Sequence, residues 1–145
     1  MTELVTLLGP YQSALMVLAG TAIIALVQSF LCAPLSFIKE EQVPGMPLRL
    51  DHSRLSFRAI RTYQNSVESL PPFLAALLLA IMVGVPAGAV NGLAVAYLVF
   101  RLAFWAIYYS GIGRVAGGAR TLAYVGGLLA NLALAGWALV AIALN

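Results

Sequence analysis

The chain has 145 residues, of which 62% are hydrophobic and only 9% are charged, and its mean hydropathy is +0.96. Soluble domains carry about a quarter charged residues, so this composition excludes a soluble globular domain. It predicts an integral membrane protein in contact with lipid, with one small helical domain over residues 1–145. The formal charge of +3 includes no basic run of the kind that binds nucleic acid.

Four apolar segments have about the 20 residues that a helix needs to cross the hydrocarbon core. They cover residues 11–31, 54–85, 90–109 and 121–144, and they predict an all-α fold with four transmembrane helices in an up-down bundle. The second segment is purely apolar only from Leu70 to Val85, which is too short to cross. Its helix must therefore begin earlier, near Arg54.

Charged residues indicate the orientation of the bundle. Lys39, Arg49 and Arg54 precede the second span, Arg114 and Arg120 precede the fourth, and the turn between spans two and three has no charge. Because cytoplasmic loops are enriched in Lys and Arg, we expect both basic loops in the cytoplasm and both termini on the opposite side.

Cysteine and histidine are too scarce for a metal centre. Cys32 is the only cysteine, so an internal disulfide is impossible, and His52 is the only histidine. We expect no bound metal.

Polar side chains of the second span share one helix face. At about 100° per residue, five of them fall within an arc of about 80°: Arg54, Arg58, Arg61, Asn65 and Glu68. The first two also suit an anchoring role, with their charges at the membrane surface. Ionisable groups deeper in a membrane normally face a bundle interior or a wet cavity.

The third and fourth spans carry matching polar faces. One face of the third holds Tyr97, Arg101, Phe104, Trp105 and Tyr108, and the fourth begins with Arg120, Thr121 and Tyr124, with Asn131 further along. Glu68 is the natural counter-ion of Arg101, and the pair would serve either a ligand or bundle packing alone. The three faces predict one polar crevice near the cytoplasmic ends of the helices.

This excess of arginine over acidic residues predicts an anionic ligand. Arginine binds carboxylates through two parallel hydrogen bonds, asparagine both donates and accepts, and glutamate can receive an ammonium group. A small zwitterion with additional carboxylates fits these residues.

Two stretches resemble one known family. "RTYQNSVESLPPF" is similar to the second-helix signature of the membrane-associated proteins in eicosanoid and glutathione metabolism (the MAPEG family), in which Arg, Asn and Glu precede a Pro and an aromatic residue. The matching positions here are Arg61, Asn65, Glu68, Pro71 or Pro72, and Phe73. "FRLAFWAIYYSGIGRVAGGARTLAY" resembles the third-to-fourth helix region, with Arg101, Tyr108, Arg120 and Tyr124 in matching places.

The resemblance implies a homotrimer of four-helix subunits, of the bacterial type and hence of a bacterial inner membrane, with glutathione bound between subunits as co-substrate. It implies that five residues contact glutathione or support its binding site: Arg61, Asn65, Glu68, Arg101 and Tyr124. It implies a catalytic role for Arg120 and Tyr108, and for Thr121, which stands where some members have a serine. Gln64 replaces a second arginine that some members carry, and Phe30 lies where a basic residue is common.

Two functions follow from this resemblance. The first is a glutathione transferase or peroxidase that activates the thiolate toward hydrophobic electrophiles or lipid hydroperoxides, as in detoxification. The second is a glutathione-binding or structural membrane subunit without turnover. A transporter is disfavoured because the chain has no paired discontinuous helices.

Overall fold

The structure is a computed structural model that describes residues 2–37, 51–113 and 117–144. A short helix, α1 (Thr2–Leu8), and a 3₁₀ turn, η1 (Gly9–Tyr11), precede the long helix α2 (Gln12–Cys32), which ends in a second 3₁₀ segment, η2 (Ala33–Phe37). Three more long helices follow: α3 (Leu55–Met82), α4 (Ala87–Ser110) and α5 (Ala119–Leu144). Lys39, Arg49 and Arg114, which contributed to the predicted orientation, lie outside the described residues.

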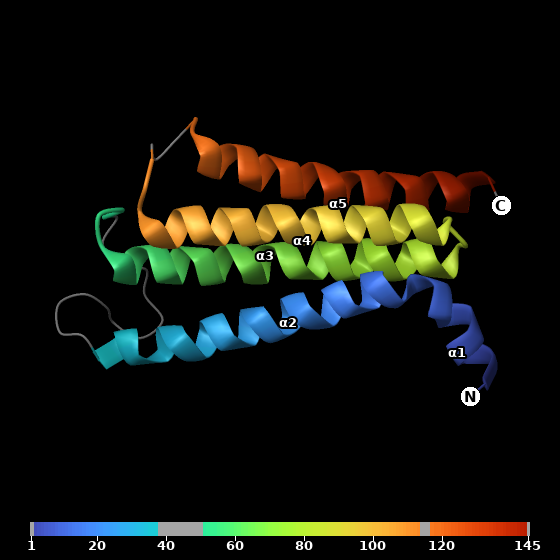
Figure 1. Cartoon of the computed structure of the whole chain (residues 1–145), viewed down its shortest axis with the longest axis horizontal. Coiled ribbons are helices and arrows are strands. Elements are labelled where there is room, and N and C mark those ends of the chain that lie inside the picture. The colour runs from blue at the N-terminus through green and yellow to red at the C-terminus, as the bar shows by residue number, and fades with distance from the viewer. Residues whose placement is uncertain (1, 38–50, 114–116, 145) are drawn as a thin grey trace.

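The four long helices run side by side in alternating directions, as Figure 1 shows. Both ends of the chain lie at one end of the bundle, together with the turn between α3 and α4. Within the described residues, four helices are long and apolar enough to cross a membrane, and every regular element is helical. The predicted all-α bundle with four spans is confirmed.

Helix boundaries near the α3–α4 turn differ from those expected. Helix α3 ends at Met82 instead of Val85, and α4 begins at Ala87 instead of Val90. Gly84 has a φ of 74°, a left-handed conformation that glycine adopts without strain and that ends a helix. Pro86 then stands at the N-cap of α4. At the other end, α3 begins at Leu55, one residue after the expected start at Arg54, and passes through Pro71 and Pro72 without a break.

The apolar core fills the half of the bundle near the termini. Phe73 of α3 stacks on Tyr97 of α4, with ring centroids 4.0 Å apart and planes 11° from parallel. Leu77 and Leu134, from α3 and α5, are fully buried beside them. Large apolar side chains also cover the outside, where Leu26 of α2 is 70% exposed. An apolar exterior of this kind suits contact with lipid, as the four spans require.

The side-chain amide of Asn91 joins the starts of α2 and α4. The Asn91 side chain accepts a hydrogen bond from the Ala14 N–H at 3.0 Å and donates one to the Pro10 carbonyl at 2.8 Å. The Tyr11 hydroxyl donates to the Val85 carbonyl at 2.8 Å and fixes the neighbouring turn. Backbone groups that the helix ends leave unpaired are satisfied in this way.

Close packing of α4 against α5 depends on Gly126. A Cβ atom there would lie 2.4–2.7 Å from the Phe100 ring, whereas one at Gly136 of the same helix would meet nothing within 4 Å. We expect Gly126→Ala to destabilise the folded protein by about 1–3 kcal/mol, as overpacking does. Gly136→Ala, the matched control, should be neutral or slightly stabilising because alanine is the better helix former.

Thermal unfolding in mild detergent measures both variants. Adding Phe100→Ala to Gly126→Ala should restore most of the lost stability, because the clash needs both the Phe100 ring and the added Cβ. Equal stability of the two alanine variants would contradict this packing.

Candidate functional site

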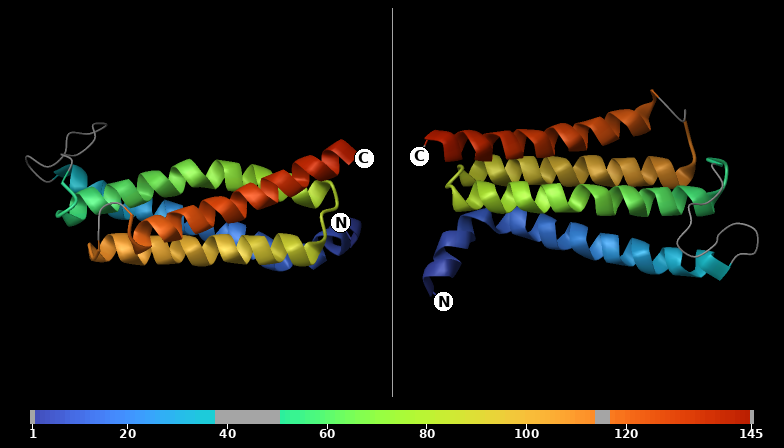
Figure 2. Two further views of the ribbon diagram at one scale, coloured as in Figure 1. Left: turned by 90° about the horizontal axis from the view of Figure 1, so that it is seen from above. Right: turned by 180° about the vertical axis from the view of Figure 1, so that it is seen from behind.

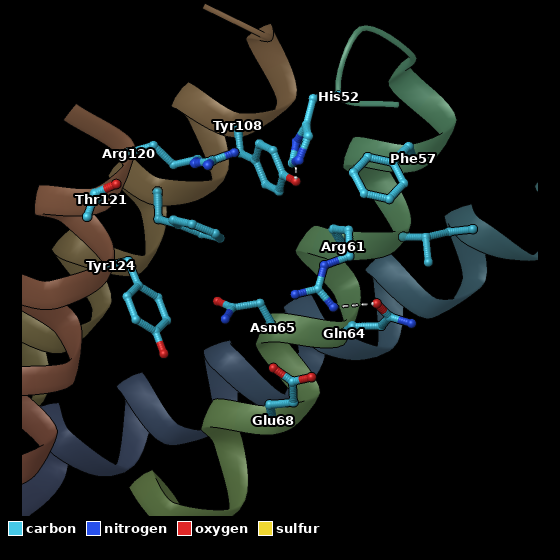
Figure 3. Close-up of a pocket in the computed structure, with 12 residues that line it drawn as sticks. His52, Phe57, Arg61, Gln64, Asn65, Glu68, Tyr108, Arg120, Thr121 and Tyr124 are labelled. Carbon is cyan, nitrogen blue, oxygen red and sulfur yellow. Dashed lines mark hydrogen bonds between the residues drawn. The ribbon is translucent and has the colours of Figure 1, made fainter. Parts of the chain in front are cut away.

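A cavity of about 610 Å³ opens between α3, α4 and α5, at the end of the bundle away from the termini (Figure 3). It is lined by His52, Phe57, Ile60, Arg61, Gln64, Asn65, Glu68, Phe104, Tyr108, Arg120, Thr121 and Tyr124. Seven of the eight residues predicted to form the site are among them. The eighth, Arg101, lies deeper in α4 and is only 2% exposed.

One wall of the cavity is the polar face of α3. Arg61, Asn65 and Glu68 follow one another along the helix and point toward α4 and α5 in Figure 3. Spacings of four and three residues place side chains on the same helix face. Arg61 donates from Nη1 to the Gln64 Oε1 at 2.9 Å, and the Asn65 Oδ1 has no hydrogen-bond partner. This wall presents a cation, an amide and a carboxylate in sequence.

The opposite wall holds a second arginine, at the start of α5. The Arg120 guanidinium lies over the Tyr108 ring, with its Cζ 4.4 Å from the ring centroid. Cation–π contact of this kind orients the guanidinium and leaves its N–H groups available to a ligand. The Thr121 Oγ1 accepts the Gly117 N–H at 3.2 Å, and Tyr124 packs against Phe104 with centroids 6.1 Å apart.

His52 closes the outer end of the cavity, a position that no pattern in the sequence predicts. Its Nδ1 lies 3.1 Å from the Tyr108 hydroxyl, and its ring meets the Phe57 ring edge-on at 4.8 Å. The turn that carries it is shaped by Asp51, whose Oδ1 accepts hydrogen bonds from the Ser53 N–H at 2.9 Å and hydroxyl at 2.6 Å. A single histidine in a loop carries no periodic signal that would have identified it.

Arg58 holds this turn in place. Its Nη1 donates to the carbonyls of His52 at 2.9 Å and Ser53 at 2.6 Å, and its Nη2 donates to the Tyr109 carbonyl at 3.4 Å. Gly111 ends α4 with a φ of 69°, a conformation that favours glycine, and a Cβ there would also lie 2.9 Å from the Arg58 Cζ. Arg54, by contrast, is exposed and pairs with Asp51 at 3.4 Å.

The expected ion pair between Glu68 and Arg101 is wrong for the described chain. No ion pair joins them, and the Arg101 Cζ lies instead 5.3 Å from the Phe104 centroid and 5.7 Å from the Trp105 centroid. Helical spacing placed the two side chains on facing surfaces, but it does not determine how far each reaches. The aromatic rings of α4 hold the guanidinium beside their own helix.

The sequence was also compared with known proteins. A sequence model of the MAPEG family matches residues 14–140. The chain belongs to the MAPEG family. This match includes most of each membrane-spanning helix and every residue that lines the cavity. A search of curated proteins found no match.

The electrostatics of this MAPEG cavity favour a neutral His52. Partial burial lowers the pKa of His52 most, and the nearby charges of Arg120 and Arg61 lower it further. A neutral imidazole with its proton on Nε2 can accept a hydrogen bond at Nδ1 from the Tyr108 hydroxyl. Hydrogen bonds from Ser53 hold the pKa of Asp51 below its usual range, so that carboxylate does not titrate near neutrality.

Stability should fall in mild acid because of His52. Its pKa in the folded protein is depressed, so the unfolded chain takes up the proton first as the pH drops below about 6.5. Above that pH His52 is neutral, and its contribution to the stability of the folded protein is complete. This contribution is lost as the pH falls through the lowered pKa.

Thermal unfolding of the unmodified protein and of His52→Gln, measured between pH 8 and pH 5 in about half-unit steps, checks this. The variant should lose less stability than the unmodified protein over this range. Parallel curves for the two proteins would exclude His52 as the titrating group.

Proposed function

We propose that this MAPEG protein binds glutathione in the cavity and activates its thiol as a transferase or peroxidase. One observation carries the proposal: two arginines, an asparagine and a glutamate converge on a single cavity inside a membrane bundle. Its volume of about 610 Å³ lies within the range of small-molecule sites. Membership of the family supports the same ligand.

The side chains complement the functional groups of glutathione one by one. Arg61 and Asn65 suit a carboxylate and the peptide backbone, because a guanidinium binds carboxylates through paired hydrogen bonds. Glu68 suits the ammonium group. Arg120, held over the Tyr108 ring, is then available to the sulfur. Glutathione is thus a co-substrate, and the proposal needs no metal.

Activation rests on the charge of Arg120. A thiol has a pKa of about 8.5, and an adjacent cation lowers it toward neutrality. In the transferase reaction the thiolate attacks a hydrophobic electrophile and expels its leaving group. In the peroxidase reaction it attacks a lipid hydroperoxide, giving an alcohol and a sulfenic acid, which a second glutathione converts to the disulfide and water.

One observation favours the alternative of a binding subunit without turnover. The Tyr108 hydroxyl is hydrogen-bonded to His52, and the Thr121 Oγ1 accepts a backbone N–H. A Tyr108 hydroxyl that donates to His52 has no hydrogen left for a sulfur atom, whereas the Thr121 hydroxyl accepts here and keeps its own hydrogen. Thiol activation would then depend on Arg120 and Thr121, without Tyr108.

Substitutions of the two arginines should have different effects. Arg61→Ala removes an interaction made both before and during the reaction, so the Kd for glutathione should rise by about tenfold with little change in kcat. Arg120→Ala should raise the pKa of the bound thiol and lower kcat more than affinity. Arg120→Lys should restore part of the rate, because its charge remains without the planar guanidinium.

Calorimetric binding and steady-state kinetics with an apolar electrophile separate these effects. A normal kcat in Arg120→Ala would remove this arginine from thiol activation. Glutathione binding without turnover in the unmodified protein would support the binding subunit.

We also propose a homotrimer whose basic end faces the cytoplasm. Glu68 is exposed in the single chain and Tyr124 is 38% exposed, although both lie on membrane-spanning helices. A neighbouring subunit would cover such polar surface, which is unfavourable in lipid. Arg54, Arg58 and Arg120 lie at the end that the positive-inside rule assigns to the cytoplasm.

Two cysteine variants in a Cys32→Ala background test the orientation. Ile112 and Met82 are 76% and 80% exposed and lie at opposite ends of the bundle. A membrane-impermeant thiol reagent should label Met82→Cys in intact cells and Ile112→Cys only after the membrane is opened. The reverse pattern would overturn the orientation, and native mass spectrometry showing a monomer that binds glutathione would overturn the trimer.

A further inference from the structure

A second cavity, of about 120 Å³, lies deeper between α3, α4 and α5. We call it the inner chamber. Tyr97, Arg101 and Asn131 line it, and it shares Asn65, Glu68 and Tyr124 with the larger cavity. Because these three residues line both spaces, the inner chamber adjoins the proposed glutathione site on the side toward the membrane centre.

Arg101 brings a buried charge to this chamber. Its side chain is 2% exposed, and its Nε and Nη2 atoms have no hydrogen-bond partner. These two nitrogens share one edge of the guanidinium, the edge that makes paired hydrogen bonds. Phe104 and Trp105 interact with the charge through their rings but accept no conventional hydrogen bond from either nitrogen. A guanidinium stays protonated in proteins, so these donors need a partner.

Other residues of the chamber present unpaired acceptors. Asn131 is 9% exposed, and its Oδ1 and that of Asn65 are both without a partner. The Glu68 carboxylate lines the same chamber but forms no ion pair with Arg101 in the described chain. The two charges balance, so the chamber does not call for an additional anion. Its occupant has to be small, neutral and able both to donate and to accept hydrogen bonds.

Water meets all of these requirements. A space of about 120 Å³ accommodates a few water molecules, and a buried water typically makes about three hydrogen bonds. We propose that the inner chamber holds ordered waters that connect the Arg101 guanidinium to the Glu68 carboxylate. Arg101 is then a positioning residue, which directs Glu68 toward the ammonium group of glutathione. This second step rests on the proposed function, whereas the presence of the waters does not.

Hydroxyl-radical footprinting with an X-ray pulse tests the waters in the unmodified protein. Radicals formed from a bound water oxidise the side chains beside it, even where bulk solvent has no access. Tyr97 is 3% exposed and lines the chamber, and Tyr11 is 8% exposed and lies elsewhere in the core, so it is the matched control. We expect severalfold more oxidation of Tyr97 than of Tyr11. Equal or lower oxidation of Tyr97 would overturn the hydrated chamber.

Asn131→Leu provides the variant for this measurement. An apolar side chain at this position removes one polar partner and fills part of the chamber. Oxidation of Tyr97 should fall severalfold while that of Tyr11 stays constant. Unchanged oxidation of Tyr97 would show that its radicals come from outside the chamber, and would also overturn the proposal.

Glutathione binding tests the positioning step. The Kd is measured for glutathione and for an analogue in which hydrogen replaces the amino group. Arg101→Met should weaken glutathione binding by about tenfold, the effect of one hydrogen bond to a charged group, and should change analogue binding much less. Asn131→Leu should show the same selectivity, which covers the case that Arg101→Met does not fold. Equal losses for both ligands would overturn the positioning role.

The two experiments fail independently. An unmodified protein that binds no glutathione would refute the proposed function and the positioning step with it. The footprint of Tyr97 would still decide whether the chamber is hydrated.

Discussion

A charged side chain on a membrane-spanning helix has no bulk water to solvate it, so the protein must surround it with polar groups or aromatic faces. Two arginines of this protein lie against aromatic rings. Phe104 and Trp105 lie against Arg101, and Tyr108 lies under Arg120. The polar faces of α3, α4 and α5 therefore turn toward one another, while their apolar faces turn outward. The cavity is a consequence of that arrangement.

The same constraint divides the bundle along its length. The half near the termini holds the apolar core, and the cavity lies toward the opposite, basic end. Figure 2 shows from two further sides that the four long helices extend over both halves. The stacked rings of Phe73 and Tyr97 belong to the apolar core, and the Tyr97 hydroxyl donates to the Ser69 Oγ at 3.2 Å. Tyr97 thus joins the apolar core to the inner chamber. A site built on packed helices in this way has rigid support.

The length and apolar composition of four segments were sufficient to predict the four spans, and helical periodicity predicted the residues that share the polar faces. Arg61, Asn65 and Glu68 line one cavity because spacings of four and three place them on one side of α3. The same reasoning could not find the contacts of Arg58, whose partners are backbone carbonyls of the preceding turn and of α4. His52 was missed because tertiary structure alone brings its loop to Tyr108. The predicted ion pair between Glu68 and Arg101 was wrong because residue spacing does not determine how far a side chain reaches.

We propose above all that Arg120 faces a thiolate in a cavity that suits a small zwitterion. Titrating the ultraviolet thiolate absorbance of glutathione bound to the unmodified protein measures this directly. A bound thiol with an apparent pKa well below the ordinary value of about 8.5 is the expected result. A pKa equal to that of free glutathione, with binding intact, would contradict the account.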